Sequence, residues 1–233
     1  MKLEGRTALI TGSSRGVGQQ IAMGLAELGA KIIVHGRRTE NIDQTIDMLG
    51  KYDVEVFRVE GDLSVNTHIS KITGQIVDKF GGVDILYNNA AIMSSFEENI
   101  WEHSLEAWEK TFRVNLYALY FMCSAFIPGM IRRGYGRVIN LTSGIKDQPE
   151  LAPYSASKAA VDKLTQDIAV KLENTGVRIN ILDPGWLKTD MGGPNAWYDV
   201  GEVLLGALVP ALIEDDGPNG KLFSAIELKD TKL

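Results

Sequence analysis

The N-terminal region contains a short apolar segment, a glycine-rich turn and a segment with helical periodicity, in that order. Residues 7–11 (TALIT) are apolar and partly β-branched, which predicts a buried strand. The turn that follows has glycine at positions 12, 16 and 18, and apolar residues then recur at helical spacing from Ile21 onward. A strand, a glycine turn and a helix in this order are typical of a site for the phosphates of a dinucleotide. The order also predicts a chain built from α/β units.

The three glycines favour a nucleotide site over an ordinary connecting loop. Gly12 allows a tight turn, and Gly16 and Gly18 allow a backbone and a helix N-terminus to approach a pyrophosphate. The alternative is a plain strand–helix loop, which rarely needs three glycines within so few residues.

Apolar β-type segments alternate with helical patterns along the chain. Such alternation predicts a doubly wound, Rossmann-like parallel sheet of about seven strands with helices on both faces. At 233 residues, without an internal repeat or linker, residues 1–233 are expected to form a single α/β domain. Strands are predicted at residues 6–11, 31–35, 54–59, 83–88, 136–142, 177–183 and 221–226, and helices at 16–29, 40–50, 65–80, 104–131, 155–174 and 199–213. Ligands bind at the carboxyl ends of such strands, where five candidate features fall: the glycine turn, Asp62, Asn89, Ser143 and Pro184.

Tyr154 and Lys158 lie four residues apart in a predicted helix. This spacing places both side chains on one helix face, so the ammonium group can lie beside the phenol. A nearby cation favours the phenolate, and lowering the pKa of a tyrosine by about three units takes roughly 4 kcal/mol. Such a pair can transfer a proton to or from an oxygen atom during redox chemistry. The alternative is a chance pair on a solvated helix face, and the upstream glycine turn argues against it.

The glycine spacing, TGxxxGxG at residues 11–18, differs from the common GxGxxG form. Together with YxxxK at residues 154–158, it resembles the short-chain dehydrogenase/reductase family. Further motifs of that family follow in its order over essentially the whole chain: Gly61-Asp62-Leu63, Asn88-Asn89-Ala90-Ala91, Asn115, Asn140-Leu141-Thr142-Ser143, and Asp183-Pro184-Gly185 with Thr189. The resemblance implies an NAD(P)-dependent oxidoreductase that acts on CH–OH groups.

The resemblance also implies a role for each matching residue. Tyr154 would be the general acid when a carbonyl is reduced, and Lys158 would lower its pKa and bond the nicotinamide ribose. Ser143 would orient and polarise the carbonyl oxygen, and Asn115 would hold a water that links Lys158 to solvent. Asp62 would accept a hydrogen bond from the adenine amine. The full set of expected cofactor-binding residues is Gly12, Ser14, Arg15, Gly16, Val17, Gly18, Arg37, Asp62, Leu63, Asn89, Ala90, Tyr154, Lys158, Pro184, Gly185, Leu187 and Thr189.

The end of the second predicted strand indicates which nicotinamide cofactor is used. An NAD site usually has a carboxylate there that bonds the ribose hydroxyls, but this strand ends in Gly36-Arg37-Arg38. Arg15, in the glycine turn, can approach the same place. Each arginine bonded to a 2′-phosphate would contribute about 1.5–3 kcal/mol, so we expect NADP(H) to be preferred over NAD(H). The alternative is that Arg37 and Arg38 only lie on a surface loop.

Three segments depart from the family pattern. Ala91 replaces a glycine that often follows Asn-Asn-Ala, and the interval from Ser143 to Tyr154 is somewhat shorter than usual. The carboxyl-terminal region lacks the frequent Val-Asp-Gly-Gly ending. With residues 185–194, it resembles the carbonyl reductase branch. Because that ending often builds a subunit interface, the choice between homodimer and homotetramer stays open.

Composition limits the expected partners. A net charge of −6 argues against nucleic acid or an anionic membrane as a partner. The single Cys123 lies in an apolar segment, so a buried thiol, no disulfide and a cytoplasmic location are expected. No apolar signal segment fits before the first strand. His35, His68 and His103 have no metal-ligand spacing, so no metal site is expected.

An uncharged run between Arg113 and Arg132 is long enough to suggest a membrane span. It contains Asn115, Ser124 and Pro128, which favours instead a helix buried in a core or a subunit interface. In the family, the matching helix pairs with its copy, so the resemblance implies a homo-oligomer.

Two segments with aromatic and apolar residues suggest the kind of substrate. Residues 186–198 (Trp186, Met191, Trp197 and Tyr198) read as a mobile lid, and residues 92–103 add Met93, Phe96 and Trp101. These side chains favour an apolar or aromatic ketone or aldehyde, reduced by an NADPH-dependent carbonyl reductase. The alternatives are a 3-oxoacyl-[acyl-carrier-protein] reductase and a regulator that senses NADP(H) without turnover.

Overall fold

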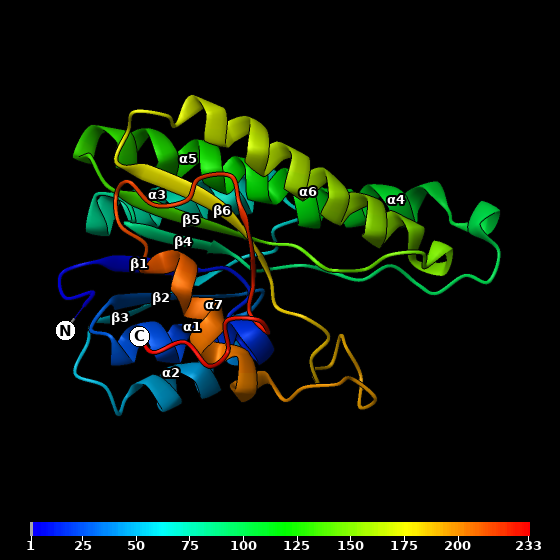
Figure 1. The fold of residues 1–233 in the computed structure, drawn as a ribbon, viewed down its shortest axis with the longest axis horizontal. Helices are drawn as coiled ribbons and strands as arrows, with labels where there is room; N and C mark the ends of the chain where they lie inside the picture. Colours follow the sequence, from blue (N-terminus) through cyan, green and yellow to red (C-terminus); the bar gives the residue numbers. More distant parts are fainter. Residues whose placement is uncertain (1) are drawn as a thin grey trace.

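The computed structural model describes residues 2–233, whose seven strands form one parallel sheet (Figure 1). The strand order is β3-β2-β1-β4-β5-β6-β7, and every neighbouring pair is parallel. The strands are β1 (Thr7–Ile10), β2 (Lys31–Gly36), β3 (Val56–Glu60), β4 (Ile85–Asn88), β5 (Gly136–Leu141), β6 (Val177–Asp183) and β7 (Leu222–Ser224). All seven predicted strands are therefore confirmed, with small differences at their ends.

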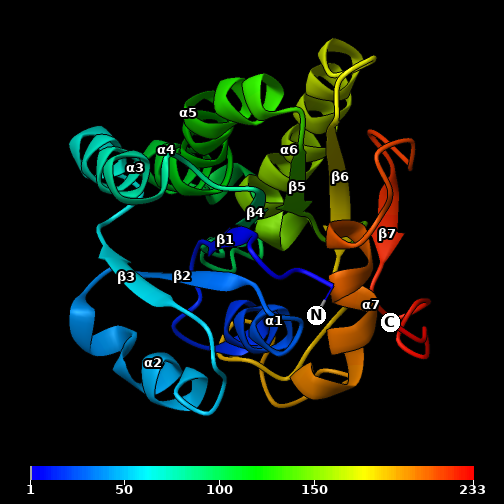
Figure 2. The ribbon, with the colours of Figure 1, turned by 90° about the vertical axis from the view of Figure 1, so that its left-hand side faces the viewer.

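Helices cover both faces of the sheet, as the alternating pattern predicts (Figure 2). One layer consists of α1 (Gly16–Glu27), α2 (Asp43–Leu49) and α7 (Leu204–Leu208). The other consists of α3 (Asn66–Phe80), α4 (Leu105–Phe112), α5 (Ala118–Arg133) and α6 (Ala152–Lys171). Figure 1 shows that α4 and the start of α6 extend beyond the sheet. The doubly wound, Rossmann-like fold is confirmed.

Alternate residues of the strands enter two separate cores. Ala8 and Ile10 of β1 belong to the core beneath α1 and α7, whereas Leu9 belongs to the core beneath α3 and α5. Ile33 of β2 likewise faces the second core. Because both faces of the sheet are covered, the strands read as continuous apolar runs rather than as alternating ones.

The direction of winding reverses between β1 and β4. The chain proceeds from β1 outward to β3, returns to β4, and then proceeds outward to β7. Sheets of this kind bind ligands beside the carboxyl ends of the two strands at the reversal. The segments after β1 and β4 lie together there, since the Thr11 amide donates to the Tyr87 carbonyl over 3.0 Å.

The long apolar segment is one continuous helical stretch, Leu105–Arg133, with a π-helical turn, η3 (Arg113–Tyr117), between α4 and α5. By its length, and by the mean hydropathy of 1.5 of an 18-residue window within it, the stretch would pass for a membrane span. Its buried side, which includes Met122 and Phe126, packs into the core beneath α3 and α5. The stretch is thus a core helix with one exposed side.

Two of the predicted helices are interrupted. The segment at 40–50 divides into a 3-10 turn, η1 (Thr39–Asn41), and α2. The segment at 199–213 divides into η5 (Val200–Val203), α7 and η6 (Val209–Ala211). Pro210 explains why α7 ends early, since proline has no amide hydrogen for an α-helical bond.

The helix that carries Tyr154 begins earlier than predicted. The turns η2 (Ile100–Glu102) and η4 (Pro149–Leu151) precede it in the chain, and α6 starts at Ala152 rather than at residue 155. Pro153 occupies the first turn of α6, where a proline is well tolerated. Tyr154 therefore lies within the first turn of the helix.

Candidate active site at the carboxyl edge of the sheet

The glycine turn adopts a backbone that other residues would strain. Gly12 and Gly16 have φ angles of +65° and +59°, in the left-handed region that favours glycine. A Cβ atom on Gly18 would lie 2.4 Å from Asn89 Nδ2 and 2.7 Å from the Gly12 carbonyl oxygen. Each of the three glycines is therefore required by conformation or by close packing.

The first turn of α1 leaves its amides available for an anion. Arg15 is the N-cap residue, no side chain caps the turn, and the turn contains no acidic residue. The first amides of a helix lack partners within the helix and point toward a ligand. The turn and the start of α1 together fit the pyrophosphate of a dinucleotide.

Asn89, expected to bind cofactor, supports the glycine turn through its side chain. Its Nδ2 donates to the carbonyls of Thr11 at 2.8 Å and Gly12 at 3.0 Å. Thr11 Oγ1 in return accepts from the amides of Asn89 at 3.0 Å and Ala90 at 3.1 Å. The segment after β4 is thus locked to the turn after β1.

The segments after β2 and β3 lie side by side. The Gly61 amide donates to the Gly36 carbonyl over 3.1 Å, which brings the exposed Arg37 toward Asp62. Burial acts to raise the pKa of Asp62, but hydrogen bonds from Ser64 and the charges of Arg37 and His68 together hold it below its ordinary value. Asp62 is therefore an ionised acceptor next to a free guanidinium, which suits an adenosine whose ribose carries a phosphate.

No pattern in the sequence marks His35 as part of this region, yet it is buried at the end of β2 with both ring nitrogens bonded. Nδ1 accepts from the Gly12 amide over 3.0 Å, and Nε2 lies 3.1 Å from the Gly61 carbonyl oxygen. A histidine within a strand gives no signal of such contacts, because its partners are backbone groups distant in the chain.

Tyr154 and Lys158 lie together on the inner face of α6. The Lys158 Nζ atom is 5.7 Å from the centre of the Tyr154 ring and donates to the Leu141 carbonyl over 2.8 Å. Both side chains are buried. The two groups therefore converge at the carboxyl end of β5, as their spacing predicts.

The expected lowering of the Tyr154 pKa by Lys158 is wrong for this structure. Burial raises the pKa of Tyr154, and the charge of Asp183 adds to the increase, while a hydrogen bond with Ser143 opposes it. Burial also lowers the pKa of Lys158 to about 8, against the effect of Asp162 and Asp183. The amine is directed to the Leu141 carbonyl, and burial outweighs its influence on the phenol.

Asn115 is held within the π-helical turn η3. Its Oδ1 accepts from the Ile92 amide at 2.8 Å, and its Nδ2 donates to the Ile92 carbonyl at 2.9 Å and to Ser157 Oγ at 3.0 Å. Ser157 Oγ in turn donates to the Tyr154 carbonyl over 2.7 Å. The side chain of Asn115 thus joins the segment after β4 to α6. A π-helical turn also changes the pairing of backbone carbonyls around it, a feature common at functional sites.

Residues 184–199, which we call the β6 loop, pass over the glycine turn. Thr189 Cγ2 would lie 3.5 Å from a Cβ atom on Gly16. Arg15 Nη1 and Asp190 Oδ2 are 2.8 Å apart, and both side chains are largely exposed. The loop is fixed to β6 where the Gly185 amide donates to Asp183 Oδ1 over 2.9 Å.

Aromatic side chains shape the outer part of the β6 loop. The rings of Trp186 and Trp197 meet edge to face with centres 5.5 Å apart. The Trp186 indole donates to the Gly192 carbonyl over 2.7 Å. Trp186, Met191 and Trp197 are exposed, so apolar surface is presented from this loop.

The structure gathers the expected site residues at one edge of the sheet, in two groups. The glycine turn, Asn89, Ala90 and Thr189 form the first, and Asn115, Ser143, Tyr154 and Lys158 form the second. Among the expected residues, Gly18, Leu63, Asn115, Tyr154, Lys158 and Leu187 are buried; Gly12, Ser14, Gly16, Val17, Asp62, Asn89, Ala90, Ser143, Pro184, Gly185 and Thr189 are partly buried; Arg15 and Arg37 are exposed.

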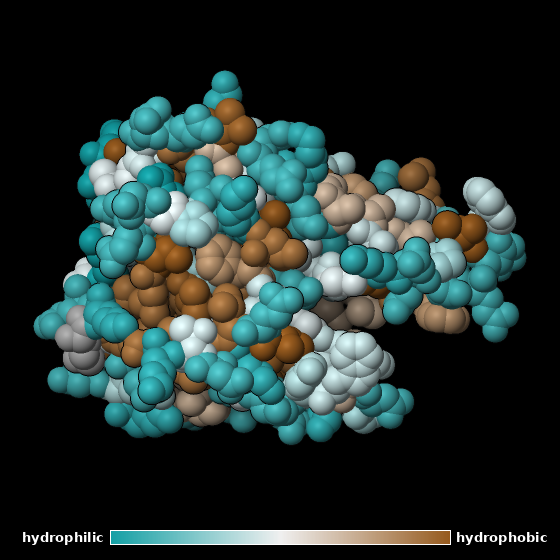
Figure 3. All heavy atoms as spheres, in the orientation of Figure 1, coloured by the Kyte–Doolittle hydropathy of each residue, from teal (hydrophilic) through white to brown (hydrophobic). Residues whose placement is uncertain are grey.

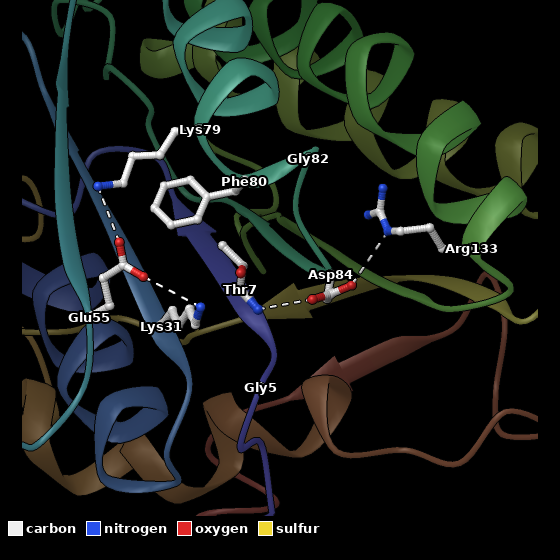
Figure 4. A pocket seen from close by; sticks show the side chains of 9 residues that line it. All are labelled: Gly5, Thr7, Lys31, Glu55, Lys79, Phe80, Gly82, Asp84 and Arg133. Carbon is white, nitrogen blue, oxygen red and sulfur yellow. Dashed lines mark hydrogen bonds and ion pairs between the residues drawn. The ribbon is translucent and has the colours of Figure 1, made fainter.

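A separate pocket of about 340 Å³ lies at the opposite, amino-terminal edge of the sheet (Figure 4). Its Lys31 and Lys79 side chains both pair with Glu55, and Arg133 pairs with Asp84. These charges compensate one another, and no expected site residue lines the pocket. It is not a candidate active site.

Outside this edge of the sheet, the titratable side chains of residues 2–233 form neither a metal site nor a reactive thiol. Within residues 2–233, no group of three or more His, Cys, Asp or Glu side chains is placed to hold a metal ion. Burial raises the pKa of Cys123 to about 12, which makes this thiol unreactive.

Comparison with known proteins identifies similar chains. A family model described as short chain dehydrogenase matches residues 6–197. The chain is 36% identical to dehydrogenase/reductase SDR family member 4 of Sus scrofa over 190 residues, 81% of this chain and 68% of that protein. A metagenomic short-chain oxidoreductase in complex with NADP is 28% identical, with a TM-score of 0.82 and coverage of 96% and 99%. A gluconate 5-dehydrogenase of Burkholderia cenocepacia in complex with NADP and tartrate is 29% identical, with a TM-score of 0.83 and coverage of 95% and 94%.

Proposed function

The chain belongs to the short-chain dehydrogenase/reductase family of oxidoreductases that act on CH–OH groups, and we propose that it uses NADPH to reduce a ketone or aldehyde to an alcohol. The observation that carries the proposal is the convergence of Tyr154, Lys158 and Ser143 at the carboxyl end of β5, on the same sheet edge as the glycine turn.

When bound, the nicotinamide supplies a hydride to the carbonyl carbon and is oxidised. As the carbonyl double bond opens, its electron pair moves to oxygen, and Tyr154 donates its phenolic proton there. The raised pKa of Tyr154 suits this direction, because the phenol stays protonated at neutral pH. Ser143 would hold the carbonyl oxygen, and its hydrogen bond with the phenol supports this placement.

Lys158 and Asn115 would support the proton transfer. The charged amine stabilises negative charge that remains on the phenol after the proton leaves. Asn115 fixes the segment after β4 to Ser157, one residue before Lys158. In this proposal the proton returns to Tyr154 by way of Lys158 and a water held at the η3 turn.

A preference for NADPH over NADH is supported by charge at the nucleotide end. Arg37 follows β2 and lies beside Asp62, and Arg15 occupies the N-cap position of α1. No carboxylate occupies residues 36–38, where an NAD site usually has one. Two similar structures hold NADP.

An apolar carbonyl compound is the favoured substrate, because Trp186, Met191 and Trp197 expose apolar surface from the β6 loop. These residues support the carbonyl reductase branch. A hydroxy acid is the second candidate, favoured by the similarity to the gluconate 5-dehydrogenase that holds tartrate. A 3-oxoacyl thioester on a carrier protein is a third class, which the same assay distinguishes.

The experiment follows NADPH absorbance with purified protein and a panel of aromatic ketones, aliphatic aldehydes, keto acids and 3-oxoacyl thioesters. We expect oxidation of NADPH with an apolar ketone or aldehyde, and none with the Tyr154→Phe variant. Turnover only with keto acids would select the second candidate. Binding of NADPH without turnover of any compound would instead favour a cofactor sensor and contradict the proposal.

We further propose that the protein forms a homo-oligomer. Tyr117, Tyr120 and Phe121 are exposed on η3 and α5, beside a groove of about 260 Å³ between α3 and α5. Figure 3 shows a second apolar area over α7 and beside β7, where Leu205 and Leu222 are exposed. Exposed apolar areas of this kind often mark subunit interfaces.

Light scattering tests this assembly. Use of the α5 face alone gives a dimer that Tyr120→Glu dissociates, and use of both faces gives a tetramer that Leu205→Glu reduces to a dimer. A monomeric wild-type protein would contradict the assembly.

We also place the protein in the cytoplasm, since its single cysteine, Cys123, is buried and forms no disulfide.

A further inference from the structure

A buried histidine connects the three segments that surround the nucleotide end of the site. His35 is only 2% exposed. It is the next-to-last residue of β2, directly before Gly36 and Arg37. Its side chain reaches the glycine turn in one direction and the segment after β3 in the other. The mechanism above makes no use of it.

The hydrogen bonds of the ring define its tautomer. The Gly12 amide donates to Nδ1 over 3.0 Å, so Nδ1 carries a lone pair. The proton must then be on Nε2, which donates to the Gly61 carbonyl over 3.1 Å. Burial lowers the pKa of His35 to about 4, against the effects of the Gly61 carbonyl and of Asp62. The ring is therefore neutral at physiological pH and keeps one acceptor and one donor.

The backbone of His35 strengthens the same connection. Its amide donates to Ser13 Oγ over 3.0 Å, and its carbonyl accepts from the Ser13 amide over 3.0 Å. Ser13 Oγ also donates to the Ile10 carbonyl at the end of β1 over 2.7 Å. The position of the glycine turn relative to β2 is thus defined by three separate bonds to one residue.

We propose that His35 is a positioning residue for the nucleotide site, holding the glycine turn and the Gly61–Asp62 segment in the spacing that an adenosine diphosphate unit requires. This inference rests on the proposed function. Gly12 belongs to the turn for the pyrophosphate, and Gly61 precedes the residue expected to meet the adenine. Through its two ring nitrogens, His35 fixes one relative to the other before the cofactor arrives. Such preorganisation increases affinity by reducing the ordering that accompanies binding.

Two substitutions separate the two bonds of the ring. In His35→Asn, the amide oxygen can take the place of Nδ1 and accept from Gly12, but the side chain is too short to reach Gly61. In His35→Gln, the terminal amide can reach toward Gly61, but nothing accepts from Gly12. We expect each substitution to raise the Kd of both NADPH and NADH about three- to tenfold, because each loses one buried hydrogen bond. The kcat at saturating cofactor should stay within about twofold of wild type, since the ring contacts no reacting atom.

A matched control distinguishes positioning from general stability. Tyr87 is fully buried and donates to the Ala207 carbonyl over 2.9 Å, on the side of the sheet that faces α7. Tyr87→Phe also loses one buried hydrogen bond, so its melting temperature should fall comparably. We expect its Kd for NADPH to be unchanged. Folded His35 variants that bind NADPH as tightly as wild type would overturn the inference.

A measurement on the wild-type protein needs no variant. Amide hydrogen exchange should show that the Gly12 amide is protected in the free protein, and that NADPH adds little protection. Rapid exchange of Gly12 in the free protein would overturn the inference even if both variants fail to fold. A wild-type protein that binds neither NADPH nor NADH would instead contradict the proposed function, so the two failures are distinguishable.

Discussion

Arg15 and Asp190 form an ion pair of 2.8 Å that joins the glycine turn to the β6 loop. Their side chains are 67% and 70% exposed, and exposed pairs of this kind contribute only about 0–1 kcal/mol. Arg15 can therefore readily exchange Asp190 for another anionic partner. Under the proposed function, Asp190 and the 2′-phosphate of NADPH compete for the same guanidinium.

Asp190→Asn should release Arg15 for the cofactor. We expect the Kd for NADPH to fall about two- to fivefold, while the Kd for NADH changes less, because an exposed ion pair is worth about 1 kcal/mol or less. Titration of the reduced nucleotide fluorescence measures both constants. Asp167→Asn is a matched control, since Asp167 pairs with Lys163 on the exposed side of α6. Equal shifts for the two cofactors would show that Asp190 acts on the shared pyrophosphate instead.

Arg37→Asp should reverse the cofactor preference. It removes a cation expected at the 2′-phosphate and places a carboxylate where NAD sites have one. Loss of one charge-assisted bond of about 1.5–3 kcal/mol predicts a Kd for NADPH at least about tenfold higher. Arg38→Asp, at the neighbouring exposed position, serves as control and should have a smaller effect. If the ratio of kcat/KM for NADPH and NADH is unchanged in Arg37→Asp, this assignment is wrong.

Tyr154→Phe should lose catalysis and keep its cofactor. Removing the phenolic oxygen removes the proton donor, and general acid catalysis typically contributes about 10²–10⁴ in rate. We therefore expect kcat to fall about a thousandfold while the Kd for NADPH stays within about twofold. Stopped-flow or end-point assays of NADPH oxidation measure the first quantity, and fluorescence titration measures the second. A variant with near wild-type turnover would exclude Tyr154 as the acid.

The lowered pKa of Lys158 predicts that activity falls with rising pH while the stability of the folded protein rises. As pH rises through about 8, the amine loses its charge, so the rate of carbonyl reduction should fall. Since the folded pKa lies below the ordinary 10.5, burial of the charged amine opposes folding at neutral pH, and this effect disappears as pH rises from about 8 to about 10.5. Lys158→Met should therefore be inactive yet more stable than wild type at pH 7, with an advantage that shrinks over that window. Urea unfolding of both proteins at several pH values provides the test, and a constant difference would contradict the assignment.

Gly18→Ala should weaken both folding and cofactor binding. The new methyl group would lie 2.4 Å from Asn89 Nδ2 and 2.7 Å from the Gly12 carbonyl oxygen, so the turn must move. Overpacking of this kind costs about 1–3 kcal/mol, and we expect the Kd for NADPH to rise as the turn distorts. Gly74→Ala in α3 is the control: nothing lies within 4 Å of the added methyl group, and helix stability should gain up to about 1 kcal/mol. Thermal unfolding with and without NADPH measures both effects.

Much of the fold can be predicted from local sequence patterns: apolar segments, glycine positions and helical spacing. The strands β1 and β2 are apolar on both faces because helices cover both faces of the sheet, and such a continuous apolar run is readily recognised in the sequence. The left-handed backbone at Gly12 explains why the turn after β1 is glycine-rich. The convergence of Tyr154 and Lys158 follows from helical spacing alone.

Local sequence patterns do not predict contacts between segments that are distant in the chain. The strand predicted at 136–142 includes Arg137, whose side chain is only 1% exposed within β5. Its guanidinium donates to the Ile213, Gly136 and Gly176 carbonyls and to Asp215. Apart from Gly136, its neighbour in β5, these partners come from loops whose approach no spacing in the sequence reveals.

The pKa of Tyr154 illustrates the same limit. Helical spacing placed a cation beside the phenol and suggested that the cation would dominate. The degree of burial, which opposes ionisation of both groups, depends on how α6 packs against α4 and β5. The role of His35 was hidden for the same reason, since its partners are backbone groups of two other loops.

The reversal of strand order between β1 and β4 divides the sheet into two halves that contribute different residues to the proposed site. Under the proposed function, the half before β4 carries the glycine turn, Arg37 and Asp62 for the nucleotide, and the half after it carries the proton donor Tyr154 and the exposed aromatic residues of the β6 loop. Substitutions of the exposed aromatic residues in the β6 loop should therefore change which carbonyl compounds bind while the glycine turn is left intact. For protein engineering, the turn that precedes β4, in which Gly81 is exposed and Gly82 is buried, is a natural point of recombination between two parents.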